Sequence, residues 1–349
     1  MSGTLETKHA ATGSAPTPLI EVTGLHKQFA SGGRFRRSRR SVHAVDDLAI
    51  RIHAGETFAL VGESGCGKST TARLMLSLQR PTSGDIRYKG TPLSMMSDAE
   101  RRDYRRRVQV VFQDSNSSLN PRKRLGTILT TALTVSGAER DARRAVDRAH
   151  QLLEDVGLSP AASFFDRYPH ELSGGQRQRV GIARALAPEP ELIIADEPVS
   201  ALDISVRAQI LQLLQRIQRE RSVAYLFISH DLSVVRWVAH RVGVMYLGRL
   251  VETGPVEAVF SRPVHPYTEV LINATPVANP QHAQLRHAHV VSGDVPPTTE
   301  RPSGCPFHPR CPLAVDACRS EVPDLVPVGD THAAACLRAQ ERVEGLRLP

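Results

Sequence analysis

The spacing of apolar residues along the chain separates predicted strands from predicted helices. Short runs of consecutive or alternating apolar residues predict strands at 20–29, 42–52, 57–61, 108–112, 191–196 and 224–229. The first two runs flank an arginine-rich loop and predict a hairpin. Helical spacing predicts helices over residues 68–78 and 205–219 and a third that starts at Asp231.

Residues 126–186 differ from the rest because helical spacing predominates there. Within 142–156, apolar side chains recur every three or four positions with charged residues between them. We therefore expect a helical insertion. The runs before and after it alternate with helices and are almost continuously apolar, which is typical of parallel strands buried on both faces. The predicted fold class is α/β.

Composition and charge narrow the class of protein. A length of 349 residues is enough for about two domains. The net charge of +8 suits an anionic partner, but much of it lies in residues 34–40 (RFRRSRR). This run is most simply a solvated hairpin tip, with contact to anionic lipid head groups as the alternative. Aromatic residues make up only 5%, which argues against a base-stacking platform.

The sequence also bears on location. No apolar run approaches the roughly 18 residues that a membrane-spanning helix needs. Residues 1–18 lack the apolar core of a signal peptide and predict a disordered tail. We expect a cytosolic location, where the cysteines would not form disulfides.

Residues 62–69 (GESGCGKS) fit the pattern G-x-x-x-x-G-K-[ST] and lie between a predicted strand and a predicted helix. Glycines allow successive backbone N–H groups to surround phosphate oxygens, and the helix N-terminus favours the same negative charge. Lys68 should reach the β and γ phosphates, and Ser69 should bind Mg²⁺. The alternative, a glycine turn before an ordinary helix, explains the context less well. The predicted phosphate-binding residues are Gly62, Glu63, Ser64, Gly65, Cys66, Gly67, Lys68, Ser69 and Thr70.

Three further polar positions follow predicted strands. Asp196 and Glu197 end one of them and could supply a metal ligand and a base for the attacking water. His230 follows residues 224–229 and could reach a γ-phosphate, and Gln113 could orient water or bind the metal. Taken singly, these residues are more often a polar turn, a capping histidine and a surface turn. The P-loop upstream reverses that preference.

Residues 171–179 (ELSGGQRQR) place a serine and two glycines at a predicted helix start, a second phosphate cradle in one chain. With GESGCGKST, VVFQD, LIIADEP, SALD and FISHD, in this order and spacing, they resemble the ATP-binding cassette family over about residues 20–260. The resemblance implies a P-loop NTPase (RecA-like) core, an antiparallel β subdomain, a helical subdomain at about 114–186, and an active ATPase.

In that family two cassettes pack head to tail, and each ATP lies between the P-loop of one and the LSGGQ of the other. The resemblance therefore assigns Ser173, Gly174, Gly175 and Gln176 to the γ-phosphate held by a partner. It makes Glu197 the general base, Asp196 and Gln113 residues of the Mg²⁺ site, and His230 the γ-phosphate sensor. Residues 200–203 (SALD), with Asp203, would link the two sites, and Phe29 would stack on adenine.

The last third resembles a narrower group. HPYTEVLINATP (265–276) and GCPFHPRCPLA (304–314) resemble the C-terminal extension of ATPase subunits of oligopeptide, dipeptide and nickel importers, and FQDSNSSLNPR resembles their "F"-type subunit. The predicted organisation is a tail (1–18), a nucleotide-binding domain (19–262) and a cysteine-rich extension (263–349).

That resemblance implies several partners: a second, related ATPase subunit in a heterodimer, two membrane permease subunits and an extracytoplasmic solute-binding protein. The chain would be peripheral, at the cytoplasmic face of the membrane, and would bind no nucleic acid. Import of nickel or another small solute is one alternative. A soluble cassette protein acting on nucleic acid is another, disfavoured by the single cassette and the importer-type tail.

Four cysteines, Cys305, Cys311, Cys318 and Cys336, crowd into this extension, separated by five, six and seventeen residues. Structural zinc sites usually contain a closer pair, and ferredoxin spacing is absent too. Spacing alone leaves free thiols, zinc and an iron–sulfur cluster open. Some similar subunits carry a [4Fe–4S] cluster on such a tail, so the resemblance implies a cluster. His282, His287 and His289 lack metal-like spacing and indicate a solvated linker.

Overall fold

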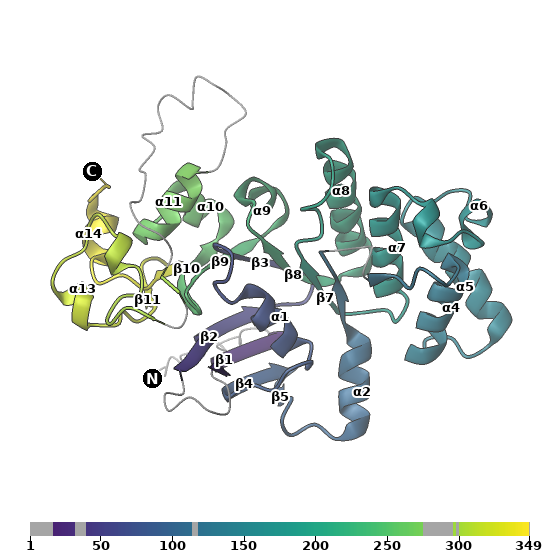
Figure 1. Cartoon of the computed structure of the whole chain (residues 1–349), viewed down its shortest axis with the longest axis horizontal. Helices are drawn as coiled ribbons and strands as arrows, with labels where there is room; N and C mark the ends of the chain where they lie inside the picture. The colour runs from purple at the N-terminus through teal and green to yellow at the C-terminus, as the bar shows by residue number, and fades with distance from the viewer. Residues whose placement is uncertain (1–16, 32–39, 114–117, 275–295, 298–299, 349) are drawn as a thin grey trace, which may run out of the picture.

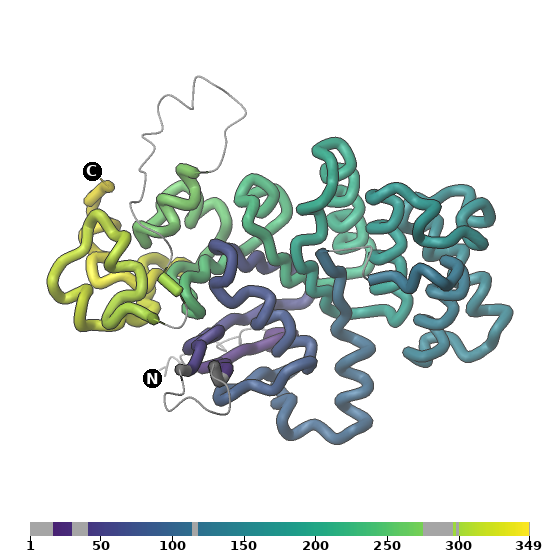
Figure 2. The backbone as a smooth tube through the Cα atoms, in the orientation of Figure 1, coloured from purple at the N-terminus to yellow at the C-terminus, as the bar shows by residue number. Residues whose placement is uncertain are grey.

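The computed structural model describes residues 17–31, 40–113, 118–274, 296–297 and 300–348. The predicted tail up to residue 16, the hairpin tip at 34–39 and the three linker histidines lie outside the described residues. The molecule is elongated, with the helical insertion and the C-terminal extension at opposite ends of its long axis (Figures 1 and 2).

Five parallel strands form the centre of the larger sheet, in the order β9-β3-β8-β7-β6. Four of them match predicted strands closely. They are β3 (Thr57–Val61), β6 (Val108–Val111), β7 (Leu192–Asp196) and β8 (Ala224–Ser229). The fifth, β9 (Arg241–Tyr246), was not predicted. The expected parallel α/β sheet is confirmed.

Alternate residues of these strands enter two different hydrophobic cores. Ile193 and Phe227 belong to the core shared with the helices, whereas Ile194 and Leu226 belong to the core shared with the smaller sheet. All four are buried. A strand with apolar contacts on both sides needs apolar side chains at every position, which explains the continuous runs in the sequence.

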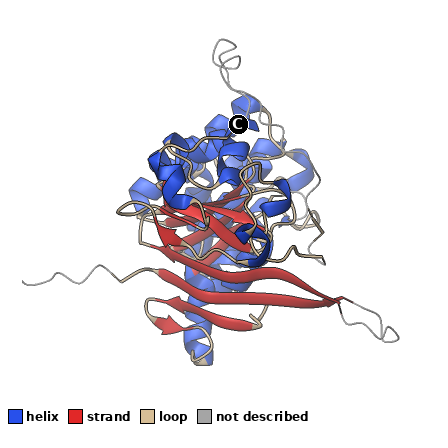
Figure 3. Ribbon diagram, turned by 90° about the vertical axis from the view of Figure 1, so that its left-hand side faces the viewer, coloured by secondary structure: helices blue, strands red, loops and turns tan. Residues whose placement is uncertain are grey.

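The smaller, antiparallel sheet packs against the second face of the parallel strands, and Figure 3 shows it below the helices. Its order is β2-β1-β4-β5. The predicted hairpin is present as β1 (Ile20–Ser31) and β2 (Arg40–Ile52), and it is extended by β4 (Ser83–Tyr88) and β5 (Thr91–Pro92), which the sequence did not indicate.

Helices cover the first face and form the insertion. The insertion contains α4 (Leu125–Ser136), α5 (Ala142–Asp155), α6 (Ala162–Phe165) and α7 (Gly174–Leu186), and α8 (Ile204–Arg221) follows β7. Helix α1 (Lys68–Met75) ends three residues before the predicted 78, because Ser77 adopts a left-handed backbone with φ 54°.

Helix α2 (Asp98–Arg107) was missed because its single buried side chain, Tyr104, gives no apolar period. It starts instead with a capping box in which Ser97 and Glu100 bond each other's backbone N–H groups. The described residues contain no helix with the length and apolar content needed to cross a membrane.

The C-terminal extension packs onto the cassette core. After β10 (Arg249–Pro255) and the helices α9 (Leu232–Val238) and α10 (Val256–Ser261), the chain forms α11 (Pro266–Ala274), α13 (Ala317–Ser320), α14 (Ala339–Glu344) and the short strands β11 (Val326–Pro327) and β12 (Ala333–Ala334). Strand β12 pairs with β10, so the extension continues the large sheet.

A buried carboxylate reinforces this junction. Glu252 of β10 is fully buried and accepts bonds from the N–H groups of Val264 and His265, both at 2.8 Å, while His332 Nε2 lies 2.7 Å away. One core cluster also contains Val61 of the cassette and Phe307 of the extension. Packing is therefore continuous across the domain boundary predicted at residue 262.

Candidate nucleotide-hydrolysis site

The loop between β3 and α1 has the backbone that a phosphate cradle requires. Gly62 and Gly67 adopt φ 149° and 111°, and a Cβ at either would lie 2.2 Å from a carbonyl oxygen, that of Met245 or Ala44. No other residue fits these two positions. The loop therefore turns tightly against β2 and the end of β9, and α1 starts at Lys68 with its N-terminus facing the loop.

Lys68 is held in place by the loop itself. Its side chain is buried, and Nζ donates to the carbonyl oxygens of Gly62 at 2.7 Å and Glu63 at 2.9 Å. The ammonium group is thus fixed at the mouth of the cradle, where a phosphate would meet it. Ser69 lies beside Asp196, with Oγ 3.5 Å from Oδ1.

Lys68 and Ser69 border a cleft of about 610 Å³, whereas Gly62, Glu63 and Asp196 are not among its lining residues. Most of the residues that line it were predicted as site residues. The two from β2 were not, because the sequence of a hairpin strand does not indicate which part of the fold the far end of the strand faces. The lining residues are Val42, Ala44, Ser64, Gly65, Gly67, Lys68, Ser69, Thr70, Gln113, Glu197 and His230.

Phe29, the predicted adenine-stacking residue, does not itself line this cleft. It is 38% exposed, pairs in register with Val42 across the hairpin, and carries the Lys27 ammonium 5.1 Å from its ring centroid. The ring is therefore on the strand next to a lining residue, and its stacking role stays a prediction.

The Glu197 carboxylate is fixed by side chains from two other strand ends. Gln113 Nε2 donates to one oxygen at 2.9 Å, and His230 Nδ1 lies 2.9 Å from the other. Glu197 also has a left-handed backbone, φ 46°, and its N–H bonds the carbonyl of Ile228 at 2.9 Å. Such a backbone costs roughly 1–2 kcal/mol in a non-glycine residue and is concentrated at functional sites. No pattern in the sequence predicts this strain.

Asp196 is suited to a cation. Burial raises the pKa of its carboxyl above the ordinary value, and the neighbouring charge of Glu197 raises it further, while the bond from Ser69 acts in the opposite direction. A partly desolvated carboxylate beside the Ser69 hydroxyl offers oxygen ligands of the kind that Mg²⁺ prefers. These residues fit the expected metal.

The second glycine-rich segment begins a helix, as predicted, but away from the cleft. Ser173 is the N-cap of α7 and forms a capping box with Gln176. Gly175 packs against α8, where a Cβ would lie 2.4 Å from Val206 Cγ1. The described lining of the cleft includes none of residues 173–176, and Figure 1 shows α7 well apart from α1. Within this chain the two glycine-rich segments therefore do not share one cleft.

The turn between β7 and α8 faces outward near the cleft. Ser200 Oγ donates to the Glu197 carbonyl at 3.1 Å, and Asp203 is the N-cap residue of α8. The next residue, Ile204, is 84% exposed. An aliphatic side chain so exposed beside the catalytic candidates was not singled out from the sequence, and it suits a surface that another chain covers.

The four C-terminal cysteines, all free thiols, converge on one small cavity of about 20 Å³. Burial raises the pKa of Cys311 to about 12 and that of Cys336 to about 11, and the other thiols of the set add to each shift. Among the described residues, however, no group of three or more His, Cys, Asp or Glu side chains is arranged so that it could hold a metal ion. The expected cluster is not supported by this arrangement.

Together, the phosphate cradle and the acid pair define the site of a P-loop nucleotide hydrolase, and a second glycine-rich helix start lies apart from that site. Two family models match the sequence, "ABC transporter" over residues 45–200 and "Oligopeptide/dipeptide transporter, C-terminal region" over residues 251–318.

Relatives and a solved structure agree with these matches. The probable peptide ABC transporter ATP-binding protein y4tS of Sinorhizobium fredii is 53% identical over 91% of this chain and 89% of its own length. The oligopeptide transport ATP-binding protein AppF of Bacillus subtilis is 45% identical over 91% and 96%. A dimeric post-hydrolysis structure of the cassette MJ0796 with ADP and phosphate superposes with a TM-score of 0.59 at 27% identity, over 68% of this chain and 98% of the other. The chain belongs to the ABC transporter family, among its ATP-binding proteins.

The environment of Asp196 predicts that replacing its carboxylate lowers the ATPase activity but raises the stability of the fold. Asp196→Asn should lower Mg²⁺-dependent ATPase activity by about 100-fold or more and raise the melting temperature. Because burial penalises the ionised carboxylate, the stability gain should be largest well above the raised pKa and should fade as the pH falls through it.

ATPase assays and thermal melts at several pH values check this. Asp324→Asn, at an exposed carboxyl of the C-terminal extension, is the matched control and should change neither quantity. A melting temperature that falls at neutral pH in Asp196→Asn would contradict the burial argument.

Proposed function

We propose that this chain is the ATP-hydrolysing subunit of an importer that takes up di- and oligopeptides through separate membrane permease subunits. The carrying observation is the Glu197 carboxylate, held between Gln113 and His230 at the mouth of a P-loop cleft. The match of residues 251–318 to the oligopeptide/dipeptide transporter region, and the names of the two relatives, support the peptide substrate.

The chemistry follows from the side chains that border the cleft. The P-loop N–H groups and Lys68 bind and orient the phosphates of ATP, and Ser69, Asp196 and Gln113 would hold Mg²⁺ there. Glu197 takes the proton of the attacking water, and His230, by its contact with Glu197, reports whether the γ-phosphate is present. Bound Mg²⁺ supplies positive charge against the phosphate oxygens.

A second cassette would complete the site. Ser173, Gly174, Gly175 and Gln176 would meet the nucleotide of a partner, and Asp203 and the exposed Ile204 would lie in the interface. The segment FQDSNSSLNPR resembles the "F"-type subunit of such importers, and the relative AppF is named with the same letter. We therefore propose that the partner is a related but different ATPase. Binding of ATP between two chains converts nucleotide affinity into closure, which hydrolysis then reverses.

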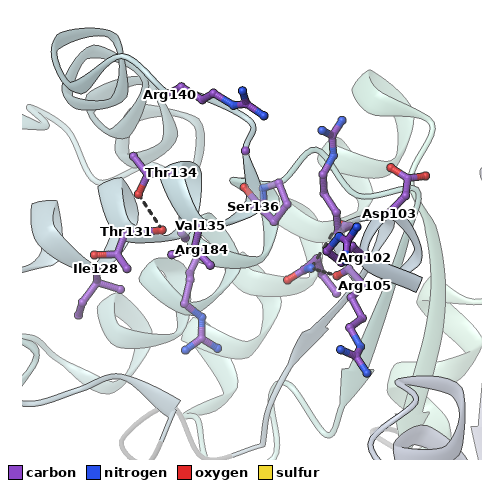
Figure 4. A pocket seen from close by; sticks show the side chains of 15 residues that line it. Arg102, Asp103, Arg105, Ile128, Thr131, Thr134, Val135, Ser136, Arg140 and Arg184 are labelled. Carbon is purple, nitrogen blue, oxygen red and sulfur yellow. Dashed lines mark hydrogen bonds between the residues drawn. The ribbon is translucent and has the colours of Figure 1, made fainter. Parts of the chain in front are cut away.

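A groove next to the helical insertion suits the permeases. It has a volume of about 810 Å³ and lies between α2 and α4, with Ile128 and Val135 on one wall (Figure 4). Five arginines and a single acid line it, namely Arg102, Arg105, Arg106, Arg140, Arg184 and Asp103. We assign it to a short cytoplasmic helix of a permease, and the chain would then lie at the cytoplasmic face of the membrane. Solute specificity would belong to a separate binding protein.

Two alternative functions fit less well. Import of nickel or another small solute uses the same extension, but the two relatives are named for peptides. Action on nucleic acid rests only on the net charge of +8. We also retain the division at residues 262 and 263, with the cassette before it and the extension after it.

For the four cysteines we propose a [4Fe–4S] cluster, with zinc or free thiols as the alternatives. The proposal follows from the resemblance of the tail to cluster-bearing subunits. All four thiols line one cavity, but among the described residues they are not arranged to hold a metal ion. That cavity has about the volume of one water molecule, so loading would require the cysteine-bearing loops to move apart. Binding of four thiolates to one cluster would also stabilise the fold of an extension that has only a small hydrophobic core of its own.

The proposed activity can be tested on the intact complex. Purification of the chain from membranes should recover two permeases and a second ATPase, and peptide with its binding protein should stimulate ATP hydrolysis. Glu197→Gln should lower this rate by about 100-fold or more while retaining ATP binding, because it removes the base and keeps the shape. Stimulation by DNA or RNA in place of peptide would refute the importer.

The composite site predicts an effect of Ser173 beyond its role as a helix cap. Ser173→Ala should lower the ATPase rate of the complex about tenfold or more and stability by about 0.5–2 kcal/mol. Ser97→Ala removes the equivalent cap of α2 and is the matched control, with a similar stability loss and an unchanged rate. Equal rates in the two variants would rule out a phosphate contact by Ser173.

The cysteine proposal is tested by metal content. Anaerobically purified protein should contain iron and acid-labile sulfide in a ratio of about four each per chain, and Cys311→Ser should lose both. Cys66→Ser, at the fifth cysteine, should retain them. Stoichiometric zinc, or no metal at all, would overturn the cluster.

A further inference from the structure

Two side chains of the C-terminal extension bind Glu63 of the phosphate cradle. Tyr267, in α11, accepts a bond from the backbone N–H of Glu63 at 2.9 Å. Arg310 forms a two-pronged ion pair with the Glu63 carboxylate, with nitrogen–oxygen distances of 2.9 and 3.1 Å. These contacts span 204 and 247 residues of sequence.

Both contacts are built into the packing. Tyr267 is fully buried, and the Arg310 side chain is only 9% exposed although it carries a charge. Phe307 packs against both, with its ring centroid 5.4 Å from that of Tyr267 and 5.8 Å from the Arg310 guanidinium carbon. A guanidinium pairs with a carboxylate in two parallel bonds only when both planes are aligned, so this pair defines orientation as well as distance.

The contact at Glu63 acts directly on Lys68. The N–H of Glu63 and the carbonyl of Gly62 belong to the same planar peptide unit. Tyr267 holds the N–H side of that unit, and Lys68 Nζ binds the carbonyl side at 2.7 Å. A rotation of this peptide would therefore move the carbonyl that positions the lysine. The Glu63 carbonyl, which also accepts from Lys68, belongs to the residue that Arg310 anchors.

We propose that Arg310 and Tyr267 are positioning residues for nucleotide binding, through which the cysteine-bearing extension sets the geometry of the P-loop in the same chain. Arg310 also neutralises a carboxylate that would otherwise repel the phosphates. Because Arg310 directly precedes Cys311 and Phe307 follows Cys305 by two residues, a displacement of these cysteines is transmitted to the cradle. This inference rests on the proposed nucleotide site.

Titration of the purified full-length chain with a fluorescent ATP analogue tests the proposal. Arg310→Gln should weaken binding by about five- to twenty-fold, and Tyr267→Phe by about three- to ten-fold. Arg319→Gln is a matched control in an exposed arginine of the same extension, and Tyr225→Phe removes a buried hydroxyl that has no hydrogen-bond partner among the described residues. Both controls should bind as wild type does.

A double-mutant cycle separates positioning from a general loss of structure. In a Glu63→Gln background, Arg310→Gln should cause little further loss, because its effect passes through the Glu63 carboxylate. Arg310→Lys keeps the charge but not the paired geometry and should give an intermediate affinity. If Arg310→Gln does not fold, Arg310→Lys with Glu63→Gln provides the same comparison.

Three results would overturn the proposal: wild-type affinity in a folded Arg310→Gln, additive losses in the cycle, or full recovery in Arg310→Lys. Failure of the underlying nucleotide site gives a different pattern. In that case wild-type protein would not bind the analogue, or Lys68→Ala would bind it equally well.

Discussion

The parallel register of four strands determines where the chemistry of this protein lies. Strands β3, β6, β7 and β8 run in the same direction, with Val61 beside Ser229 and Asp196 beside Ile228. Their carboxyl ends therefore meet at one edge of the sheet, and the residues that follow them are neighbours in space although the sequence separates them widely. The P-loop, Gln113, Glu197 and His230 all follow such strand ends. The two-sided apolar core that fixes this register is what holds the Glu197 carboxylate between its two partners.

Much of this arrangement could be predicted from the sequence because its signals are local. Buried parallel strands have continuous apolar sequences, and the predicted bounds of β3, β7 and β8 agree with the structure to within one residue. The P-loop pattern and the residues after each strand indicated the polar side of the cleft. Helix α2, by contrast, is defined by its cap and not by an apolar face, so periodicity could not detect it. Strands β4 and β5 are short and half exposed, and they gain their partners only in the folded sheet.

Features that depend on contacts across the fold could not be predicted. The left-handed backbone of Glu197, the place of Val42 and Ala44 beside the phosphate loop, and the grip of the extension on Glu63 all arise from tertiary packing. The four cysteines illustrate the same limit. Their spacing suggested no known site, yet the fold brings them to one cavity. Ser173 caps α7 within the chain, and its contact with a partner's phosphate stays a prediction, because one chain alone cannot show it.

The distance of 247 residues between Glu63 and Arg310 has a consequence for the order of events during synthesis. The ribosome makes the phosphate loop early and releases the arginine only after most of the polypeptide has emerged. Until then the phosphate loop of the nascent cassette lacks the ion pair between Glu63 and Arg310. Under the positioning role that we propose for Arg310, the affinity for nucleotide would therefore reach its final value only after the extension has docked.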